Sequence, residues 1–175
     1  MKKIIIGILI STSFFCFGQN KKIENWTEKE KIKYQKLIEL AQYVNGKEKS
    51  EISNDILFKK YIEFDYVLKD TSKIRIEKRI QSFDTLFYYF RRPIDSLEIK
   101  NLDAKPVRFY KEHKIYKPFN NELAGIKSNV FVYFIKDKPE NPKGTLWFDE
   151  KSNKLIAWIL LNQGGYRYFL SFNLL

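Results

Sequence analysis

Cysteine, methionine and histidine each occur only once in the 175-residue sequence. Zinc sites, haem sites and thiol catalysis draw on cysteine and histidine, and a disulfide needs two cysteines. The lack of these residues excludes a disulfide within the chain and argues against most metal, haem and thiol chemistry. We therefore predict no metal and no cofactor.

The motifs of the common catalytic scaffolds are also missing. The sequence has no G-x-S-x-G elbow, no H-E-x-x-H, no phosphate-binding glycine loop and no glycine-rich dinucleotide fingerprint. Tyr110 and Lys114 match the Tyr-x-x-x-Lys spacing of short-chain dehydrogenases, but no nucleotide motif accompanies them. His113, between Glu112 and Lys114, is typical of a solvated surface position. No catalytic residue is nominated, and the sequence favours a role other than catalysis.

The N-terminus has the pattern of a secretory signal peptide. Lys2 and Lys3 precede an apolar or uncharged stretch over residues 4–17, and polarity returns at Gln19. Cysteine at position 16 and glycine at position 18 supply the small residues that cleavage requires. We predict a signal peptide over 1–18 and one exported domain over 19–175, either periplasmic or secreted by a bacterium.

Two alternatives apply to the same segment. A retained membrane anchor needs about 20 apolar residues, more than this stretch provides, so no transmembrane span is expected after cleavage. A lipoprotein acylated at Cys16 is disfavoured because bulky Phe14 and Phe15 stand where small residues are required. Cleavage after residue 18 leaves 157 residues without cysteine and with a net charge of +9.

Three helices are predicted in the N-terminal half. The spacing of Thr27 and Glu30 is that of a capping box, and Asn45-Gly46 is a stop signal. Residues 54–69 are predicted as a second helix, although they also alternate like a strand. Ser72 can cap a third helix with an apolar stripe from Ile76 to Phe90, which we expect to end at residues 91–93.

The C-terminal half has strand chemistry. Residues 94–128 form a connecting region with one short strand expected near 107–110. Runs rich in β-branched and aromatic residues, separated by turn signals, predict strands over 130–136, 145–148, 155–161 and 166–172. We predict an α+β fold, with about three N-terminal helices packed on a C-terminal antiparallel, curved sheet of four or more strands. This order of elements resembles the cone-shaped nuclear-transport-factor-2-like class, which implies a pocket inside the sheet.

A two-residue turn at Gly164-Gly165 would pair Leu161 with Tyr168, Ile159 with Leu170 and Ala157 with Phe172 on one apolar face. The opposite face mixes aromatic and polar side chains. Either it walls a partly polar ligand pocket, or, as is commoner for aromatic stripes, a connecting segment or a second protomer covers it. The candidate ligand-binding residues on this face are Trp147, Trp158, Leu160, Arg167 and Phe169.

A second candidate surface is a row with one basic residue at every third position, interleaved with aromatic residues. Such a row can contact phosphates, acidic sugars or an anionic membrane surface, and the alternative is a solvated basic flank. Nucleic acid is not expected as a partner of an exported protein. The candidate residues for contact with an anionic surface are Lys105, Arg108, Lys111, Lys114 and Lys117.

These patterns lead to one functional hypothesis with two alternatives. We expect a non-catalytic binding module of the cell envelope that takes an apolar or amphiphilic ligand or an acidic glycan. One alternative is a protein-interaction module, an inhibitor or assembly factor, whose partner is another envelope protein. The other is a hydrolase with two carboxylates in a cleft, at least one with a strongly raised pKa.

Overall fold

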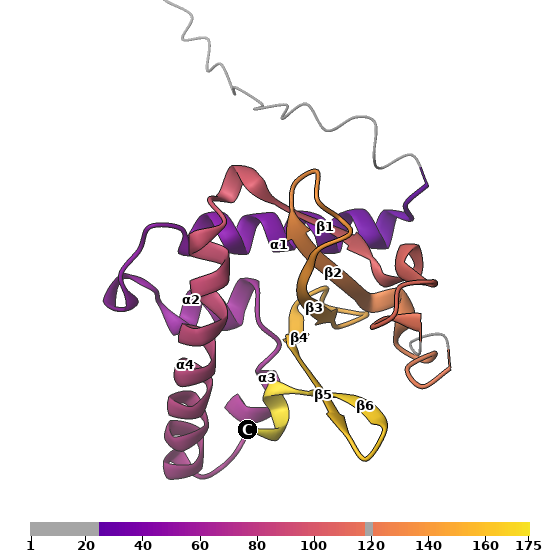
Figure 1. Ribbon diagram of the computed structural model, residues 1–175. Coiled ribbons are helices and arrows are strands. Elements are labelled where there is room, and N and C mark those ends of the chain that lie inside the picture. The colour runs from indigo at the N-terminus through magenta and orange to yellow at the C-terminus, as the bar shows by residue number, and fades with distance from the viewer. Residues whose placement is uncertain (1–24, 118–120) are drawn as a thin grey trace, which may run out of the picture.

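The N-terminal half of the chain is helical and the C-terminal half is built from antiparallel strands (Figure 1). The structure is a computed structural model that describes residues 25–117 and 121–175. It confirms the predicted α+β fold class. The predicted signal peptide and its alternative at Cys16 lie outside the described residues. In the described part of the chain, no helix is both long and apolar enough to cross a membrane.

In residues 25–117 and 121–175, four α-helices precede two separate sheets. Strands β1 to β4 form one antiparallel sheet in the order β1-β2-β3-β4, and β5 and β6 form a two-stranded hairpin. The sheets do not close into a cone. The helices are α1 (Glu28–Val44), α2 (Asn54–Lys60), α3 (Asp65–Leu68) and α4 (Lys73–Ser96), and the strands are β1 (Leu102–Pro106), β2 (Val130–Ile135), β3 (Pro142–Phe148), β4 (Leu155–Ala157), β5 (Ile159–Gln163) and β6 (Tyr166–Leu170).

Helix α1 begins at the predicted capping box. The Thr27 hydroxyl accepts a hydrogen bond from the Glu30 amide at 3.2 Å, and the Glu30 carboxylate accepts one from the Thr27 amide at 2.8 Å. Two backbone donors that lack a helical partner are thereby satisfied. The helix ends at Val44, and Gly46 follows with a φ of 69°, a value that favours glycine.

The single helix predicted over 54–69 was wrong, because the chain leaves helical geometry between α2 and α3. Ile62 forms a parallel bridge with Leu155 at the edge of β4. The Leu155 amide donates to the Tyr61 carbonyl at 2.7 Å, and the Glu63 amide donates to the Leu155 carbonyl at 2.8 Å. The strand-like alternation in this segment reflects that pairing, which places Ile62 and Phe64 in the core.

Helix α4 begins at the predicted cap, where the Ser72 hydroxyl accepts from the Arg75 amide. Its predicted end at residues 91–93 was wrong, since the helix continues through Pro93 to Ser96. Proline inside a helix costs stability by removing a backbone donor. Here the apolar stripe continues beyond it, because Ile94 and Leu97 are both buried.

The strands differ from the expected meander at two places. The strand expected near 107–110 is a 3-10 helix, η3 (Val107–Tyr110), and the strand lies just before it as β1. The strand expected over 155–161 is divided at Trp158 into β4 and β5. The turn prediction was right: Gly164 and Gly165 have φ values of 61° and 84°, and the β5–β6 register has the predicted pairs. The expected pair of Ala157 with Phe172 is not part of that register.

Both faces of the main sheet are buried. One face packs against the helices and holds Phe131, Leu146 and Phe148. The other packs against the segment that follows β1, through a cluster of Val107, Tyr110, Tyr116, Val130, Val132, Phe134, Ala157 and Phe169. The chain between β1 and β2, described over residues 107–117 and 121–129, is called the covering segment below. It buries the second face of the sheet, as the helices bury the first.

The close approach of Gly144 in β3 to Tyr133 in β2 provides a test of this packing. A Cβ atom added at position 144 would lie 2.7 Å from Tyr133 Cε1, and the buried ring has little room to move. We expect Gly144→Ala to lower the free energy of unfolding by about 1–3 kcal/mol, measured by urea denaturation. Gly125→Ala is the control, because nothing lies within 4 Å of its added Cβ. An equal loss in both variants would contradict the assignment.

Candidate functional site

Three of the five residues predicted to bind a ligand lie together under the covering segment. Phe169 is buried in the same cluster as Val107, Tyr110 and Tyr116, and Trp147 and Leu160 pack against it. The Trp147 and Phe169 ring centroids are 5.7 Å apart. This part of the mixed face is thus occupied by the protein's own side chains, as the covering-segment alternative expects.

Trp158 lies apart from these three residues. Its ring stacks on Phe90 of α4 with centroids 4.4 Å apart and contacts Phe172 at 4.3 Å. The break between β4 and β5 falls at this residue and places its side chain on the helical side of the sheet. Alternation along one continuous strand, on which the prediction depended, does not hold across that break.

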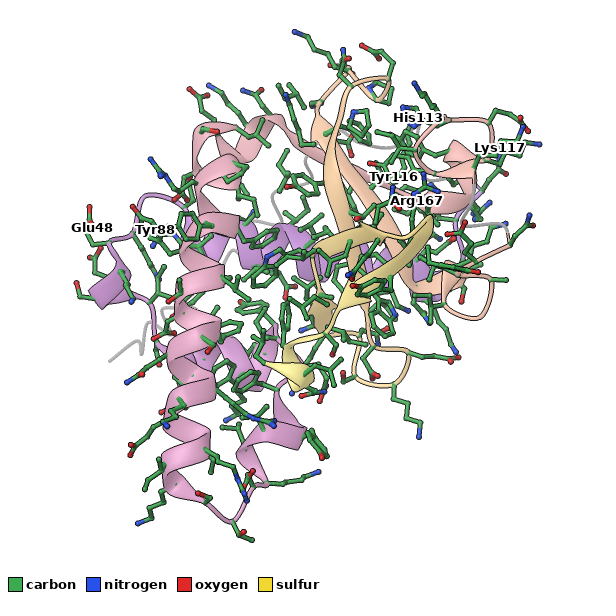
Figure 2. All side chains as sticks on the ribbon, turned by 60° about the horizontal axis from the view of Figure 1, so that its bottom comes forward. Glu48, Tyr88, His113, Tyr116, Lys117 and Arg167 are labelled. Carbon is green, nitrogen blue, oxygen red and sulfur yellow. The ribbon has the colours of Figure 1, made fainter. Side chains whose placement is uncertain are left out.

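Arg167 lies on the hairpin, in the region of Tyr116 and Lys117 (Figure 2). Its backbone amide donates to a carboxylate oxygen of Glu122 at 3.2 Å. This bond ties β6 to the covering segment, to which Tyr116 also belongs. The Arg167 side chain is half-buried.

The basic row is divided by the fold. Arg108 pairs with a carboxylate of α1, and Lys105 is half-buried with its ammonium 5.8 Å from the Phe134 ring centroid. Lys111, Lys114 and Lys117 are exposed, and Lys117 lies 4.0 Å from the Glu112 carboxylate. Three of the five predicted contacts therefore remain on an open surface.

A hollow of about 610 Å³ opens where α1 begins, and Arg108 is part of its wall. Its size is within the usual range of small-molecule sites, roughly 300–1,000 Å³. It brings together residues far apart in the sequence, mostly charged or polar: Thr27, Glu28, Lys29, Glu30, Arg108, Ala124, Lys127, Ser128, Asn129 and Glu150.

The ion pair between Glu30 and Arg108 has more hydrogen bonds than the other charged pair of this hollow, Lys29 with Glu150. Arg108 Nε and Nη2 lie 2.7 Å and 2.9 Å from the two carboxylate oxygens, and Nη2 also donates to the Asn25 carbonyl. Burial by itself would raise the pKa of Glu30, but hydrogen bonds from Arg108 and Thr27 outweigh it and hold the pKa below its usual value. Glu30 is therefore an ionised, fixed acceptor.

The other side chains of the wall are polar and less constrained. Lys29 Nζ lies 3.1 Å from a carboxylate oxygen of Glu150, and both side chains are largely exposed. Asn129 is buried, and Ser128 is exposed. Beside the hollow, the Arg108 guanidinium lies 4.2 Å from the centroid of the half-exposed Phe109 ring. Donors and acceptors are thus available to a ligand.

Lys33, one turn further along α1, is a residue that the sequence analysis missed. Its side chain is fully buried, and among the described residues its Nζ has no hydrogen-bond partner. Burial lowers the pKa of Lys33, with a further contribution from Lys29, against the opposing effect of Glu150. Its spacing to Leu37, Leu40 and Val44, all buried, continues an apolar stripe of α1 and was the available signal.

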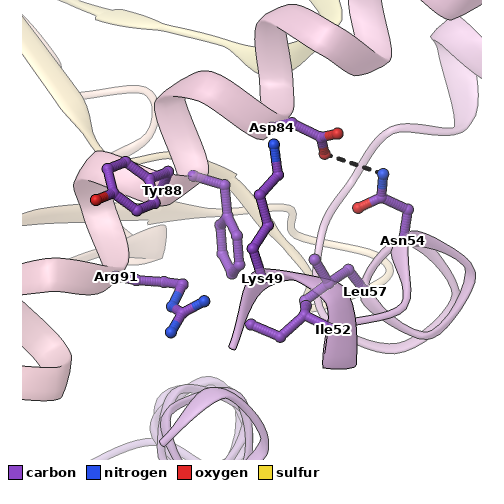
Figure 3. Close-up of a pocket in the computed structure, with 8 residues that line it drawn as sticks. Lys49, Ile52, Asn54, Leu57, Asp84, Tyr88 and Arg91 are labelled. Atoms are coloured by element: carbon purple, nitrogen blue, oxygen red, sulfur yellow. Dashed lines mark hydrogen bonds between the residues drawn. The ribbon is translucent and has the colours of Figure 1, made fainter. Parts of the chain in front are cut away.

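A second hollow lies between α2 and α4 and is much smaller, about 70 Å³ (Figure 3). Its wall includes Asn54, whose side-chain amide donates to Asp84 at 2.9 Å, and Arg91, which is paired with Asp95 at 3.1 Å. Its floor is formed by Ile52, Leu57 and Phe87. A volume this small admits a few atoms and not a ligand of ordinary size.

The hydrolase alternative requires a carboxyl group that holds a proton. Among the described residues, each carboxyl group with a clear shift, Glu30, Asp70 or Asp149, has its pKa lowered. No cluster of three or more potential metal ligands occurs in the described ranges. The hollow thus offers fixed charges and hydrogen-bonding groups.

Comparison of the chain with protein-family models, curated proteins and solved structures gives no match.

Buried Lys33 leads to a prediction about stability and pH. A lysine with a lowered pKa in the folded state disfavours folding while it is charged, and this penalty disappears as the pH rises towards 10.5, its ordinary pKa. We expect Lys33→Met, which keeps the length and removes the charge, to raise the free energy of unfolding near neutral pH by about 1 kcal/mol. The gain should shrink as the pH rises.

Urea denaturation at a series of pH values measures this effect. Lys29→Met, on the same helix but exposed, is the control and should change stability by less than about 0.5 kcal/mol. Destabilisation by Lys33→Met at neutral pH, or a gain that grows at alkaline pH, would show that the Lys33 charge is stabilising.

Proposed function

We propose that the protein is a non-catalytic binding module of the bacterial cell envelope and that the hollow at the start of α1 binds an acidic glycan. The observation that carries the proposal is the lining of this hollow, where a fixed Arg108–Glu30 pair stands beside further charged and polar groups around one open volume. The predicted signal peptide supports the location in the envelope.

The hydrogen-bonding chemistry of the wall matches a sugar. Hydroxyl groups both donate and accept, so they pair with carboxylates on one side and with guanidinium and ammonium groups on the other. Glu28 and Glu150 are exposed and offer acceptors, while Arg108 and Lys29 offer donors.

The net charge of the whole chain favours an acidic sugar over a neutral one, while the wall itself holds equal numbers of carboxylates and cations. Each carboxylate in the wall has a cation close to it: Glu30 has Arg108, Glu150 has Lys29, and Glu28 has Lys31 at 2.6 Å. Lys127 is the third cation of the wall, beside Arg108 and Lys29. The whole chain carries a net charge of +11, which attracts anionic ligands.

The apolar-ligand form of our hypothesis has less support. It relied on Trp147, Leu160 and Phe169, which are packed under the covering segment, and on Trp158, which is stacked on Phe90. A ligand there would have to displace side chains that already bury one another. The polar hollow requires no such rearrangement.

Calorimetric titration with three probes tests the proposal: a uronic-acid oligosaccharide, a neutral oligosaccharide of the same length, and a single-chain anionic amphiphile. We expect the acidic oligosaccharide to bind most tightly. The double variant Lys29→Ala/Lys127→Ala should weaken its binding by about thirtyfold, because each of the two lost charged hydrogen bonds contributes roughly 1 kcal/mol.

The matched control is Lys136→Ala/Lys143→Ala, which removes two exposed lysines outside the hollow. Equal weakening by both double variants would mean that net charge, and not the hollow, controls binding. Tightest binding of the amphiphile would support the apolar-ligand hypothesis instead. No binding of any probe would contradict the proposal.

A further inference from the structure

Several of the most exposed apolar side chains of the described structure are carried by α3, the start of α4 and the C-terminal segment, which are neighbouring elements. Tyr66 is 68% exposed, Ile74 is 67% exposed and Leu174 is 74% exposed. Leu68, at 44%, belongs to the same group. These four residues are called the apolar pole below.

The elements that carry the apolar pole are in contact with one another. Helix α3 contacts both α4 and the C-terminal 3-10 helix η6 (Phe172–Leu174). Arg79 of α4 donates to the Asn173 carbonyl at 3.4 Å, which ties the start of α4 to η6. Figure 1 shows α3 and the C-terminus together at the bottom of the view, at the same end as the start of α4.

The charges around the apolar pole are predominantly positive. Its two aspartates are already paired, and its cations outnumber its carboxylates: Lys69, Lys73, Arg75, Lys78, Arg79 and Lys154 against Asp65, Asp70 and Glu77. Arg75 holds Asp70 through three hydrogen bonds of 2.8–3.2 Å, and Lys154 lies 3.1 Å from Asp65. In the described structure, Lys69, Lys73 and Lys78 are exposed and form no ion pair. Exposed apolar side chains therefore stand among lysines free to bind anions.

We propose that the apolar pole docks the protein on an anionic phospholipid surface. Apolar side chains that enter the interfacial region of a bilayer gain hydrophobic free energy, and neighbouring lysines gain electrostatic free energy near anionic head groups. A tyrosine ring suits this depth because one end is apolar and the other polar. The positive charge favours this partner over a second copy of the same chain, which would bring like charges together.

Co-sedimentation of the purified protein with vesicles tests the proposal. Vesicles of phosphatidylcholine with added phosphatidylglycerol are compared with phosphatidylcholine alone, at low and high salt. Binding should require the anionic lipid and should weaken with salt. Ile74→Ser/Leu174→Ser should reduce the partition coefficient at least about tenfold, because two apolar side chains no longer enter the interface.

The control double variant is Ile115→Ser/Tyr166→Ser, which removes two exposed apolar side chains from the covering segment and the β5–β6 hairpin. Exposed side chains are removed in both double variants, so neither should unfold, and circular dichroism checks this. A second comparison sets Lys69→Ser/Lys73→Ser, expected to weaken binding, against Lys111→Ser/Lys114→Ser, expected to leave it unchanged.

Three outcomes would overturn the proposal: no binding to either vesicle, equal loss in the test and control variants, or a loss confined to the control. Self-association that is abolished by Ile74→Ser/Leu174→Ser, without vesicle binding, would assign the apolar pole to a second copy of the chain. Glycan titration of the same double variants keeps this test separate from the proposed function. None of the substituted residues lines the hollow, so glycan binding should be unchanged in all of them.

Discussion

The contact of Phe83 with five other aromatic rings joins the two halves of this chain. Its ring lies 5.0–6.1 Å from those of Phe58, Phe64, Phe87, Trp158 and Phe172, which come from α2, the α2–α3 connection, α4, the break after β4 and η6. A buried phenylalanine of this kind typically contributes about 3–5 kcal/mol relative to alanine. Without a disulfide in the described residues, this aromatic packing and the aliphatic core around it hold the C-terminal strands against the helices.

The parts of the fold that could be predicted are those that depend on neighbours in sequence and not on distant contacts such as those of Phe83. The start of α1 and the stripe of α4 depend on neighbours in sequence, namely Thr27 with Glu30 and Ser72 with the residues that follow it. The same holds for the Gly164-Gly165 turn, whose backbone geometry sets the β5–β6 register. Local rules of this kind can be seen in a sequence because capping, periodicity and turn chemistry each act over a few residues.

The errors occur where distant segments override local preference. The helix expected over 54–69 is interrupted because Ile62 pairs with Leu155, more than ninety positions away. Helix α4 continues through Pro93 because Ile94 still finds a place in the core. In both cases a contact that no local pattern reveals outweighs a preference that local patterns describe well.

The candidate site shows the same division. The sequence analysis found Arg108 as a basic residue, but its partner Glu30 comes from the first turn of α1, 78 positions away. The capping role of Glu30 was predicted, whereas its second role as the carboxylate for Arg108 required knowledge of how α1 lies against the segment after β1. One buried side chain thus completes the start of a helix and fixes the guanidinium in the wall of the hollow.

The two proposed surfaces are compatible because different elements carry them. The hollow is formed at the start of α1 with residues that follow β1 and precede β2, while the apolar pole is formed by α3, the start of α4 and η6. In Figure 1 the start of α1 lies at the upper right and α3 lies at the bottom. A protein resting on a membrane through the apolar pole would therefore keep the hollow clear of the lipid. The hollow could then bind or release a glycan while the protein stays on the membrane, so the two binding events should be independent of each other.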